Sequence, residues 1–393
     1  MYTSKSKICT CSALLLLLLI LIPFIQGQPG ERIRGLVIGH SMYVWSNPFR
    51  ILFLRDPAFD HSLYPLPPDL CDDDKRKLDR VYYPRTRELL VNGYDLMVFH
   101  SARIQHFVPR QIHDLDHAFR EEGMVAMNGL SLAWDTAWVP TILSDLLPIS
   151  EHEGFHFQGY TVDLVRERDP VLTPFLDYGV EKVVGTQITT MVVRQGAVVW
   201  GYMRPQNLPW LVSWRPGGTR AGMQWVVAHI FDSWWSEEYN PYGLDVATNM
   251  IFYSLDMPLV SDIPARREAR RLFTIYQGQK SLVLSMMEWA DNLGVNTVPL
   301  SDRLFEIEVE MEESMDSYLE QDYPSTISFL NSLSPRVVEI AEEAVRLKDE
   351  AMLWIYVSEW LVVSSAGIIS GFVLWTLMIR RRMFREVKAT RFA

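Results

Sequence analysis

The chain has 393 residues, 48% of them apolar, and carries a net charge of −11. This apolar share can bury a large core, whereas the acidic balance excludes the basic surface that nucleic-acid binding requires, so we expect no nucleic-acid partner. Of the three cysteines only Cys71 follows the N-terminal segment, so the mature chain cannot form an internal disulfide. We expect a prokaryotic source, because lineages that build disulfides outside the cell use more cysteine.

The N-terminal segment has the pattern of a secretory signal. Two lysines precede an apolar run from Ala13 to Ile22, and the small residue Gly27 follows. The run is shorter than the roughly 20 residues that cross a bilayer. We predict a cleaved signal peptide at 1–27, with an uncleaved signal anchor as the alternative.

From Arg50 to Asn128, short apolar runs alternate with amphipathic stretches. The apolar runs predict strands, at 51–54, 80–83, 96–99 and 124–127. The amphipathic stretches predict helices, at 86–91 and 109–122. Because the strands show no polar alternation, we expect helices on both of their faces. This order of elements predicts an α/β fold with a parallel, flavodoxin-like sheet.

The following region is rich in β-branched and aromatic residues separated by turn residues. The stretches 155–165 and 188–202 predict β-hairpins that extend the sheet. An apolar strand at 225–231 and a helix at 247–255 complete the predicted α/β domain, which we place at 28–262.

The region 263–358 has helical periodicity and predicts a helical stalk next to the membrane. Leu304, Ile307 and Met311 lie on one stripe of a helix. Apolar residues also alternate with glutamates between 305 and 311, which leaves an edge strand as the alternative.

A second apolar stripe has the 3-4 spacing of a heptad seam. Its members are Val337, Ile340, Ala344, Leu347, Ala351 and Trp354. Such a seam buries its apolar side chains either against the protein's own domain or against a second helix. The stretch 337–354 therefore predicts either a helix packed on its own chain or a contact with a homodimer or protein partner.

The C-terminal region predicts a single transmembrane helix at 359–379. Residues 360–379 contain no charged side chain, and this uncharged segment is long enough to span a bilayer. Three arginines follow at 380–382, and basic residues next to a span favour the cytoplasmic side. We predict a single-pass protein of the cell membrane, with the N-terminus outside and a basic cytoplasmic tail at 380–393.

The stretch from about 51 to 258 resembles the class I glutamine-amidotransferase-like superfamily, and most closely its membrane-associated members that are not amidotransferases. The segments that carry the resemblance are 94–99, 119–123, 124–129, 146–148, 169–172 and 220–232. They match a progression of tyrosine-aspartate, apolar strand, helix, glycine, apolar strand and glycine. Asp169 stands where those members have histidine.

The resemblance implies a nucleophile elbow, Gly-x-Cys-x-Gly, between a strand and a helix. The matching residues here are Gly129 to Ala133, with Ser131 in place of the cysteine. The late His-x-Glu pair of the family is also missing, because Phe231 stands two residues after His229. We therefore expect no glutaminase activity.

Ligands of an open parallel sheet bind beyond the carboxyl ends of its strands. The polar residues that follow or end the predicted strands are the candidate ligand-binding residues: Asp56, His100, Ser101, Asn128, Ser131 and Asp232. No cofactor motif is present, and we expect no cofactor.

Two catalytic alternatives stay open. Ser131, His229 and Asp232 have the residue types of a serine hydrolase triad. His152, Glu153 and His156 match the zinc-peptidase pattern His-Glu-x-x-His, which requires a helix. Here the alternation around the motif favours a strand. We expect a non-catalytic binding or scaffold protein, with an extracellular serine- or zinc-dependent hydrolase as the alternative.

Overall fold

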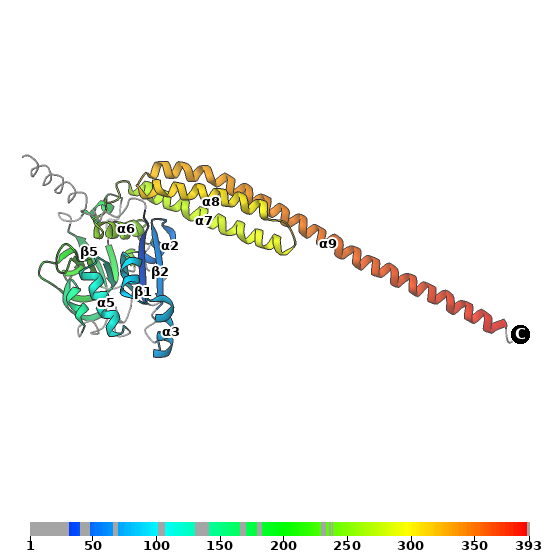
Figure 1. Ribbon diagram of the computed structural model, residues 1–393, viewed down its shortest axis with the longest axis horizontal. Helices are drawn as coiled ribbons and strands as arrows, with labels where there is room; N and C mark the ends of the chain where they lie inside the picture. Colours follow the sequence, from blue (N-terminus) through cyan, green and yellow to red (C-terminus); the bar gives the residue numbers. More distant parts are fainter. Residues whose placement is uncertain are drawn as a thin grey trace, which may run out of the picture.

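The computed structural model describes residues 31–39, 48–65, 70–100, 107–129, 141–165, 170–178, 183–228, 233–235, 237 and 239–390. They form an α/β domain, here called the head, and a rod of helices that continues as one long helix (Figure 1). The predicted signal peptide at 1–27 lies outside these residues.

The strands of the described residues form one mixed sheet in the order β2-β1-β3-β4-β9-β8-β7-β5-β6. The first five in this order pair in parallel, and the pairs from β9 to β6 are antiparallel. The strand bounds are β1 Ile33–Gly39, β2 Phe59–Pro65, β3 Leu96–His100, β4 Val125–Gly129, β5 Ile149–Leu164, β6 Val183–Val193, β7 Val198–Arg204, β8 Leu208–Trp214 and β9 Gln224–Val227. The structure confirms the predicted α/β class and the β additions to a parallel sheet.

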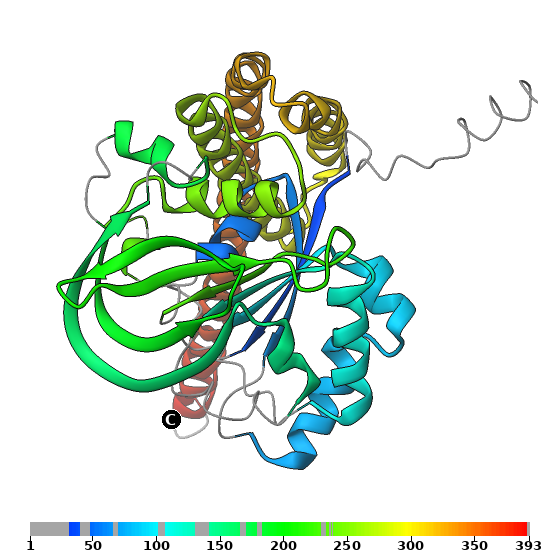
Figure 2. The same cartoon turned by 90° about the vertical axis from the view of Figure 1, so that its left-hand side faces the viewer.

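Helices cover both faces of the parallel half, while the antiparallel half curls away from it (Figure 2). The head helices are α2 Pro48–Arg55, α3 Asp72–Tyr82, α4 Arg87–Gly93, α5 Pro109–Arg120 and α6 Gly243–Ser254, with 3₁₀ turns η4 Ile142–Leu146, η6 Thr173–Tyr178 and η7 Ser233–Trp235. On one face the Trp225 indole donates a hydrogen bond to Ser254 of α6. On the other face the ring of Phe99 contacts that of Phe119 in α5. Because helices cover both faces, the strands that show no polar alternation are buried.

Two predicted strands are wrong. Residues 51–54 lie within α2, where Leu52 and Phe53 are buried and Leu54 is 60% exposed. Residues 80–83 form the last turn and C-cap of α3, with Val81 72% exposed. A short, mainly apolar run fits either a buried strand or one turn of a half-buried helix, so periodicity cannot separate the two. The strands at 96–99 and 124–127 and the helices at 86–91 and 109–122 are confirmed within one or two residues.

The stalk consists of α7 Ile263–Asn292, α8 Val298–Leu319 and the first part of α9 Tyr323–Thr390. Residues 304–318 are helical, so the edge-strand alternative is wrong. Val337, Ile340 and Ala344 of the heptad seam are at most 1% exposed. They are buried because α9 packs against α7 and α8 of the same chain. At these three residues the structure shows the alternative in which the helix packs on its own chain, whereas a homodimer or protein contact through 337–354 stays a prediction, with Trp354 of the seam 72% exposed.

The C-terminal part of α9 leaves the bundle and continues alone (Figure 1). Its segment is long and apolar enough to cross a membrane, and the most apolar part is not buried by any described residue. Apolar side chains at Leu361, Ile368 and Phe372 are more than half exposed. This exposed helix is compatible with the predicted membrane association, because lipid is the solvent that such a surface favours.

Candidate functional site at the carboxyl edge of the sheet

The strand order creates a topological switch point between β1 and β3. From β1 the chain crosses to β2 on one side, and from β2 it returns through α3 and α4 to β3 on the other side. Ligands of open parallel sheets bind beyond the carboxyl ends of the strands at such a point. The carboxyl ends of β1, β3, β4 and β9, here called the carboxyl edge, are therefore the candidate site.

Gly39 and His100 are paired at the carboxyl ends of β1 and β3. A Cβ atom at position 39 would lie 1.7 Å from the His100 carbonyl oxygen, and the Gly39 φ is +143°. Both facts require glycine at this position. His100 is 2% exposed and makes at least one polar, electrostatic or ring interaction within the protein. The predicted ligand residue His100 thus lies at the edge but is packed into the head.

Asn128 lies on β4, beside Phe99 of β3, and is completely buried. Its Nδ2 donates a hydrogen bond to the Trp225 carbonyl oxygen at 3.0 Å. Its Oδ1 has no hydrogen-bond partner among the residues that the structure describes. An unpaired buried amide oxygen costs about 1–3 kcal/mol, so a native protein normally satisfies it with water, another residue or a ligand.

The structure therefore brings His100 and Asn128 to one edge, as the sequence predicts. The other residues predicted there, Ser101, Ser131, His229 and Asp232, lie outside the described residues. The serine triad and the Ser131 elbow consequently stay predictions.

Asp56 does not belong to the carboxyl edge. It follows helix α2 and precedes β2, whose first residue pairs with the first residue of β1, so Asp56 lies at the amino edge of the sheet. The prediction failed because the run before Asp56 is a helix and not a strand. Asp56 is 2% exposed and takes part in a buried ionic cluster between head and stalk.

We call this cluster the head–stalk junction. Its members are Asp56, Asp245, Arg266, Arg270 and Tyr318. Arg266 of α7 lies 2.6 Å from Asp56, measured between Nη2 and Oδ2. Arg270 donates two hydrogen bonds to Asp245 of α6, at 2.6 and 2.8 Å. Tyr318 of α8 donates its hydroxyl hydrogen to Asp56 at 3.0 Å.

Burial and charge act together on the pKa values in the junction. Burial alone would lower the pKa of Arg266, but the nearby charge of Asp56 raises it above the ordinary value. Burial raises the pKa of Tyr318 well above that of a free tyrosine. Both arginines therefore stay charged and Tyr318 stays a donor, which holds α7 and α8 to the head through paired groups.

The junction was missed at the sequence level, although one signal was present. Arg266 and Arg270 are four residues apart, on the helical face that also carries Ala269 and Phe273. All four are buried. Arginines within an apolar stripe indicate buried ion pairs, because an isolated charge would not be placed there.

The His-Glu-x-x-His motif lies on β5, as its alternation predicts. His152 pairs with Met191 and His156 with Ile188 of β6. Along a strand these two histidines are separated by roughly 13 Å, whereas zinc ligands on a helix meet at one metal. Within the described ranges, no group of three or more His, Cys, Asp or Glu side chains could hold a metal ion.

Comparison with known proteins finds no matching protein family and no matching curated protein. Among solved structures, the chain is similar to cytoplasmic protein STM1381 from Salmonella typhimurium LT2, with 14% identity and a TM-score of 0.44. It is also similar to cytoplasmic protein STM3548 from Salmonella typhimurium, with 16% identity and a TM-score of 0.42. Each match covers 56% of this chain and 99% of the other. At these values the likeness supports no conclusion about function or location.

Proposed function

We propose that this chain is a single-pass membrane protein that displays a non-catalytic binding head at a fixed distance from the cell membrane. The head–stalk junction is the observation that carries the proposal. Its buried ion pairs join Asp56, directly after α2, and Asp245 of α6 to α7 of the stalk. The stalk helix α9 then continues without interruption into the apolar segment.

The dimensions fit a display role. The part of α9 between Tyr323 and Glu359 spans about 55 Å at 1.5 Å per residue. Breaking a buried ion pair strands an unpaired charge, which opposes rotation of the head on the stalk. A scaffold or receptor benefits from this rigidity, because its binding surface then faces a defined direction.

The proposed orientation places the head outside the cytoplasm. Arg380, Arg381 and Arg382 follow the apolar segment directly, and all three are exposed. Basic residues at one end of a span favour the cytoplasmic side, which puts the head on the other side. A cleaved signal at 1–27 would begin its export, and this also stays a proposal.

The amidotransferase-like relationship is part of the proposal. Counted without the antiparallel strands, the parallel strands have the order 2-1-3-4-5, which is the flavodoxin-like order. The buried Oδ1 of Asn128 supports a recognition site at the carboxyl edge. Ser131 in place of cysteine supports recognition without glutaminase chemistry.

A pair of substitutions tests this function. We expect Asp232→Ala to weaken binding of the native partner, isolated with the full-length protein from membranes, by about 5- to 150-fold, equivalent to about 1–3 kcal/mol. Ser131→Ala should keep both the partner and the cellular role. Glu288→Ala, at an exposed position of α7, is the matched control.

The hydrolase alternative predicts different results. Fluorophosphonate labelling of Ser131 that is lost in Ser131→Ala and in His229→Ala would make the protein a serine hydrolase. Stoichiometric zinc in the purified protein would support a peptidase. Either result would contradict the non-catalytic proposal.

A further inference from the structure

A cleft of the head lies at the opposite edge of the sheet from the candidate site, and we call it the basic cleft. It has a volume of about 490 Å³, a size that is usual for small-molecule sites. Its walls come from the first residues of β1 and β2, the end of α3 and helix α4. Arg34 of β1 and Asp60 of β2 are paired second residues of their strands, so the basic cleft lies at the amino ends of these strands.

Two arginines of the basic cleft have no acidic partner. The side chains of Arg80 and Arg85 are exposed, and they form no ion pair or hydrogen bond within the part of the chain that the structure describes. The one acidic residue of the lining, Asp60, already pairs with Arg32 at 3.4 Å. The basic cleft therefore carries two uncompensated positive charges in a chain whose net charge is −11.

The lining of the basic cleft also contains donors that lack acceptors. Nη1 of Arg34 donates to the Asn92 carbonyl oxygen at 2.7 Å, but its buried Nε lies 3.7 Å from Asp95, which is too long for a hydrogen bond. The hydroxyl of Tyr83, a residue that is 5% exposed, has no hydrogen-bond partner among the described residues. Such donors are normally satisfied by water, another residue or a ligand. The surroundings are thus rich in donors and poor in acceptors.

Exposed apolar side chains line the same cleft. Val81 and Tyr82 at the end of α3 are 72% and 43% exposed, and Leu89 of α4 is 57% exposed. Single exposed apolar residues are common, but a group of them around one hollow indicates a binding surface. Cations next to such a surface favour a molecule with an anionic group and an apolar body, because each part then has its own contact.

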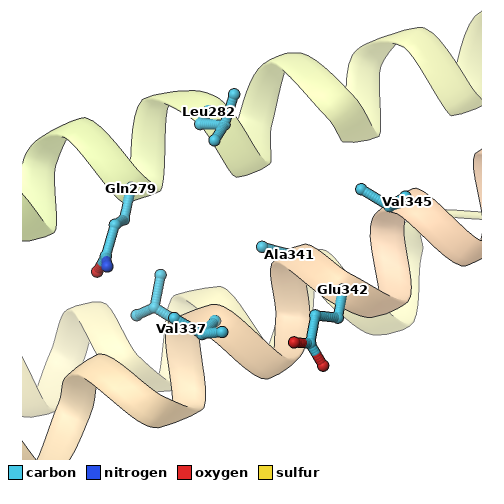
Figure 3. A pocket seen from close by; sticks show the side chains of 7 residues that line it. Gln279, Leu282, Val337, Ala341, Glu342 and Val345 are labelled. Carbon is cyan, nitrogen blue, oxygen red and sulfur yellow. The ribbon is translucent and has the colours of Figure 1, made fainter.

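A hollow in the stalk between α7 and α9 shows the contrast. Apolar side chains such as Leu282, Val337 and Val345 line it, and Glu342 is the charged member of its lining (Figure 3). A hollow with this lining offers an anion no cation to pair with. Of these two hollows, only the basic cleft combines a cavity, unpaired cations and apolar walls.

We propose that the basic cleft binds a phosphate monoester with a small apolar body. A phosphate monoester carries a charge of about −1.5 to −2 at neutral pH, which matches the two charges of Arg80 and Arg85. Arginine binds phosphate oxygens through two parallel hydrogen bonds, which gives direction as well as charge. The apolar body lies against Val81, Tyr82 and Leu89. This site is separate from the carboxyl edge, so it does not depend on the proposed function.

Titration calorimetry of the full-length protein in detergent tests the charged part of the site, with phenyl phosphate as the probe. We expect phenyl phosphate to bind at least tenfold more tightly than inorganic phosphate or benzyl alcohol, because each of these supplies only one of the two contacts. Arg80→Gln and Arg85→Gln should each weaken phenyl phosphate at least fivefold. Arg76→Gln is the matched control, because it removes the same charge one turn earlier on α3, outside the lining, and should change the affinity less than twofold.

A second pair of variants tests the apolar part. Leu89→Asn should reduce the preference for phenyl phosphate over inorganic phosphate at least threefold. Leu54→Asn should leave this preference unchanged, since Leu54 is a similarly exposed helical leucine, at 60%, outside the basic cleft. Absence of phenyl phosphate binding, equal binding of benzyl alcohol, or the same loss in Arg76→Gln as in Arg80→Gln would overturn the proposal. An unchanged preference in Leu89→Asn would also overturn it.

Discussion

At the residue scale, the head–stalk junction shows how buried charges determine a tertiary contact. Arg266 is 1% exposed and contacts Asp56, the Thr248 hydroxyl at 2.7 Å and the rings of Phe252 and Tyr318. A charge removed from water to this extent is tolerated only when its partners are in place. The junction therefore makes the stalk position sensitive to single substitutions.

Asp56→Ala tests this sensitivity. The substitution leaves Arg266 buried without its nearest carboxylate, and we expect a loss of about 3–5 kcal/mol in the free energy of unfolding. The control is Asp60→Ala, because Asp60 is an exposed residue whose pair with Arg32 is 3.4 Å long and should contribute less than about 1 kcal/mol. Urea denaturation followed by tryptophan fluorescence measures both. Equal losses in the two variants would show that the junction does not stabilise the protein.

Tyr323 makes the stability depend on alkaline pH. Burial raises the pKa of Tyr323 to about 12, whereas an unfolded tyrosine titrates near 10. Above pH 10 the unfolded state loses its proton first, so the free energy of unfolding should fall by up to about 1.4 kcal/mol per pH unit until pH 12. Below pH 10 Tyr323 adds no pH dependence. Denaturation at pH 9, 10 and 11 should show a shallower decline in Tyr323→Phe, and identical slopes would contradict this cause.

At the scale of elements, the long helices were the easiest to predict and their partners the hardest. The stripes on α8 and α9 repeat every three or four residues, which is a local property of the sequence. Whether a stripe packs within one chain or between two depends on where α7 and α8 end. The same spacing is compatible with both, and only the bundle shows that Val337, Ile340 and Ala344 face their own chain.

Ile340→Asp combined with Leu347→Asp tests this assignment of the seam. Ile340 is 1% exposed, so a charge there enters the bundle core without a partner and should destabilise the stalk by several kcal/mol. Val338→Asp is the matched control, since Val338 is 41% exposed on the neighbouring face. Circular dichroism melting and limited proteolysis of the stalk measure the effect. A double variant as stable as Val338→Asp would mean that the seam contacts another molecule.

At the scale of the whole molecule, a rod of helices separates the head from the apolar segment (Figure 1). The lone part of α9 carries Trp354, Tyr356 and Trp360 around the start of the uncharged stretch, all at least 60% exposed. Aromatic rings of this kind prefer the interface between lipid and water. They indicate where the helix enters the bilayer in the proposed arrangement.

The orientation has a direct test. Protease added to intact cells should digest the head and leave a tag after Ala393 protected, because the arginines at 380–382 favour the cytoplasmic side. Replacing these three arginines with glutamine should reduce the protected fraction. Digestion of the C-terminal tag in the unaltered protein would reverse the topology.

The sequence alone determined what depends on local chemistry. A membrane-length apolar helix, the helical stalk, the buried strands β3 and β4 and the hairpin region all follow from periodicity and composition. Three sheet strands escaped prediction. No pattern was assigned to β1 or β8, and the polar residues Asp60, His61 and Ser62 of β2 match its place at the edge of the sheet.

Only the tertiary structure decided which residues meet. Asp56 lies at the head–stalk junction and not at the predicted carboxyl edge. The residues before it form helix α2 instead of a strand, so Asp56 comes before β2, at the amino edge of the sheet. The tertiary structure also joined Asp56 to Tyr318, 262 residues away. Contacts over such separations depend on the packing of whole elements, which no local pattern encodes, whereas the helical period of an apolar stripe is set by its own residues.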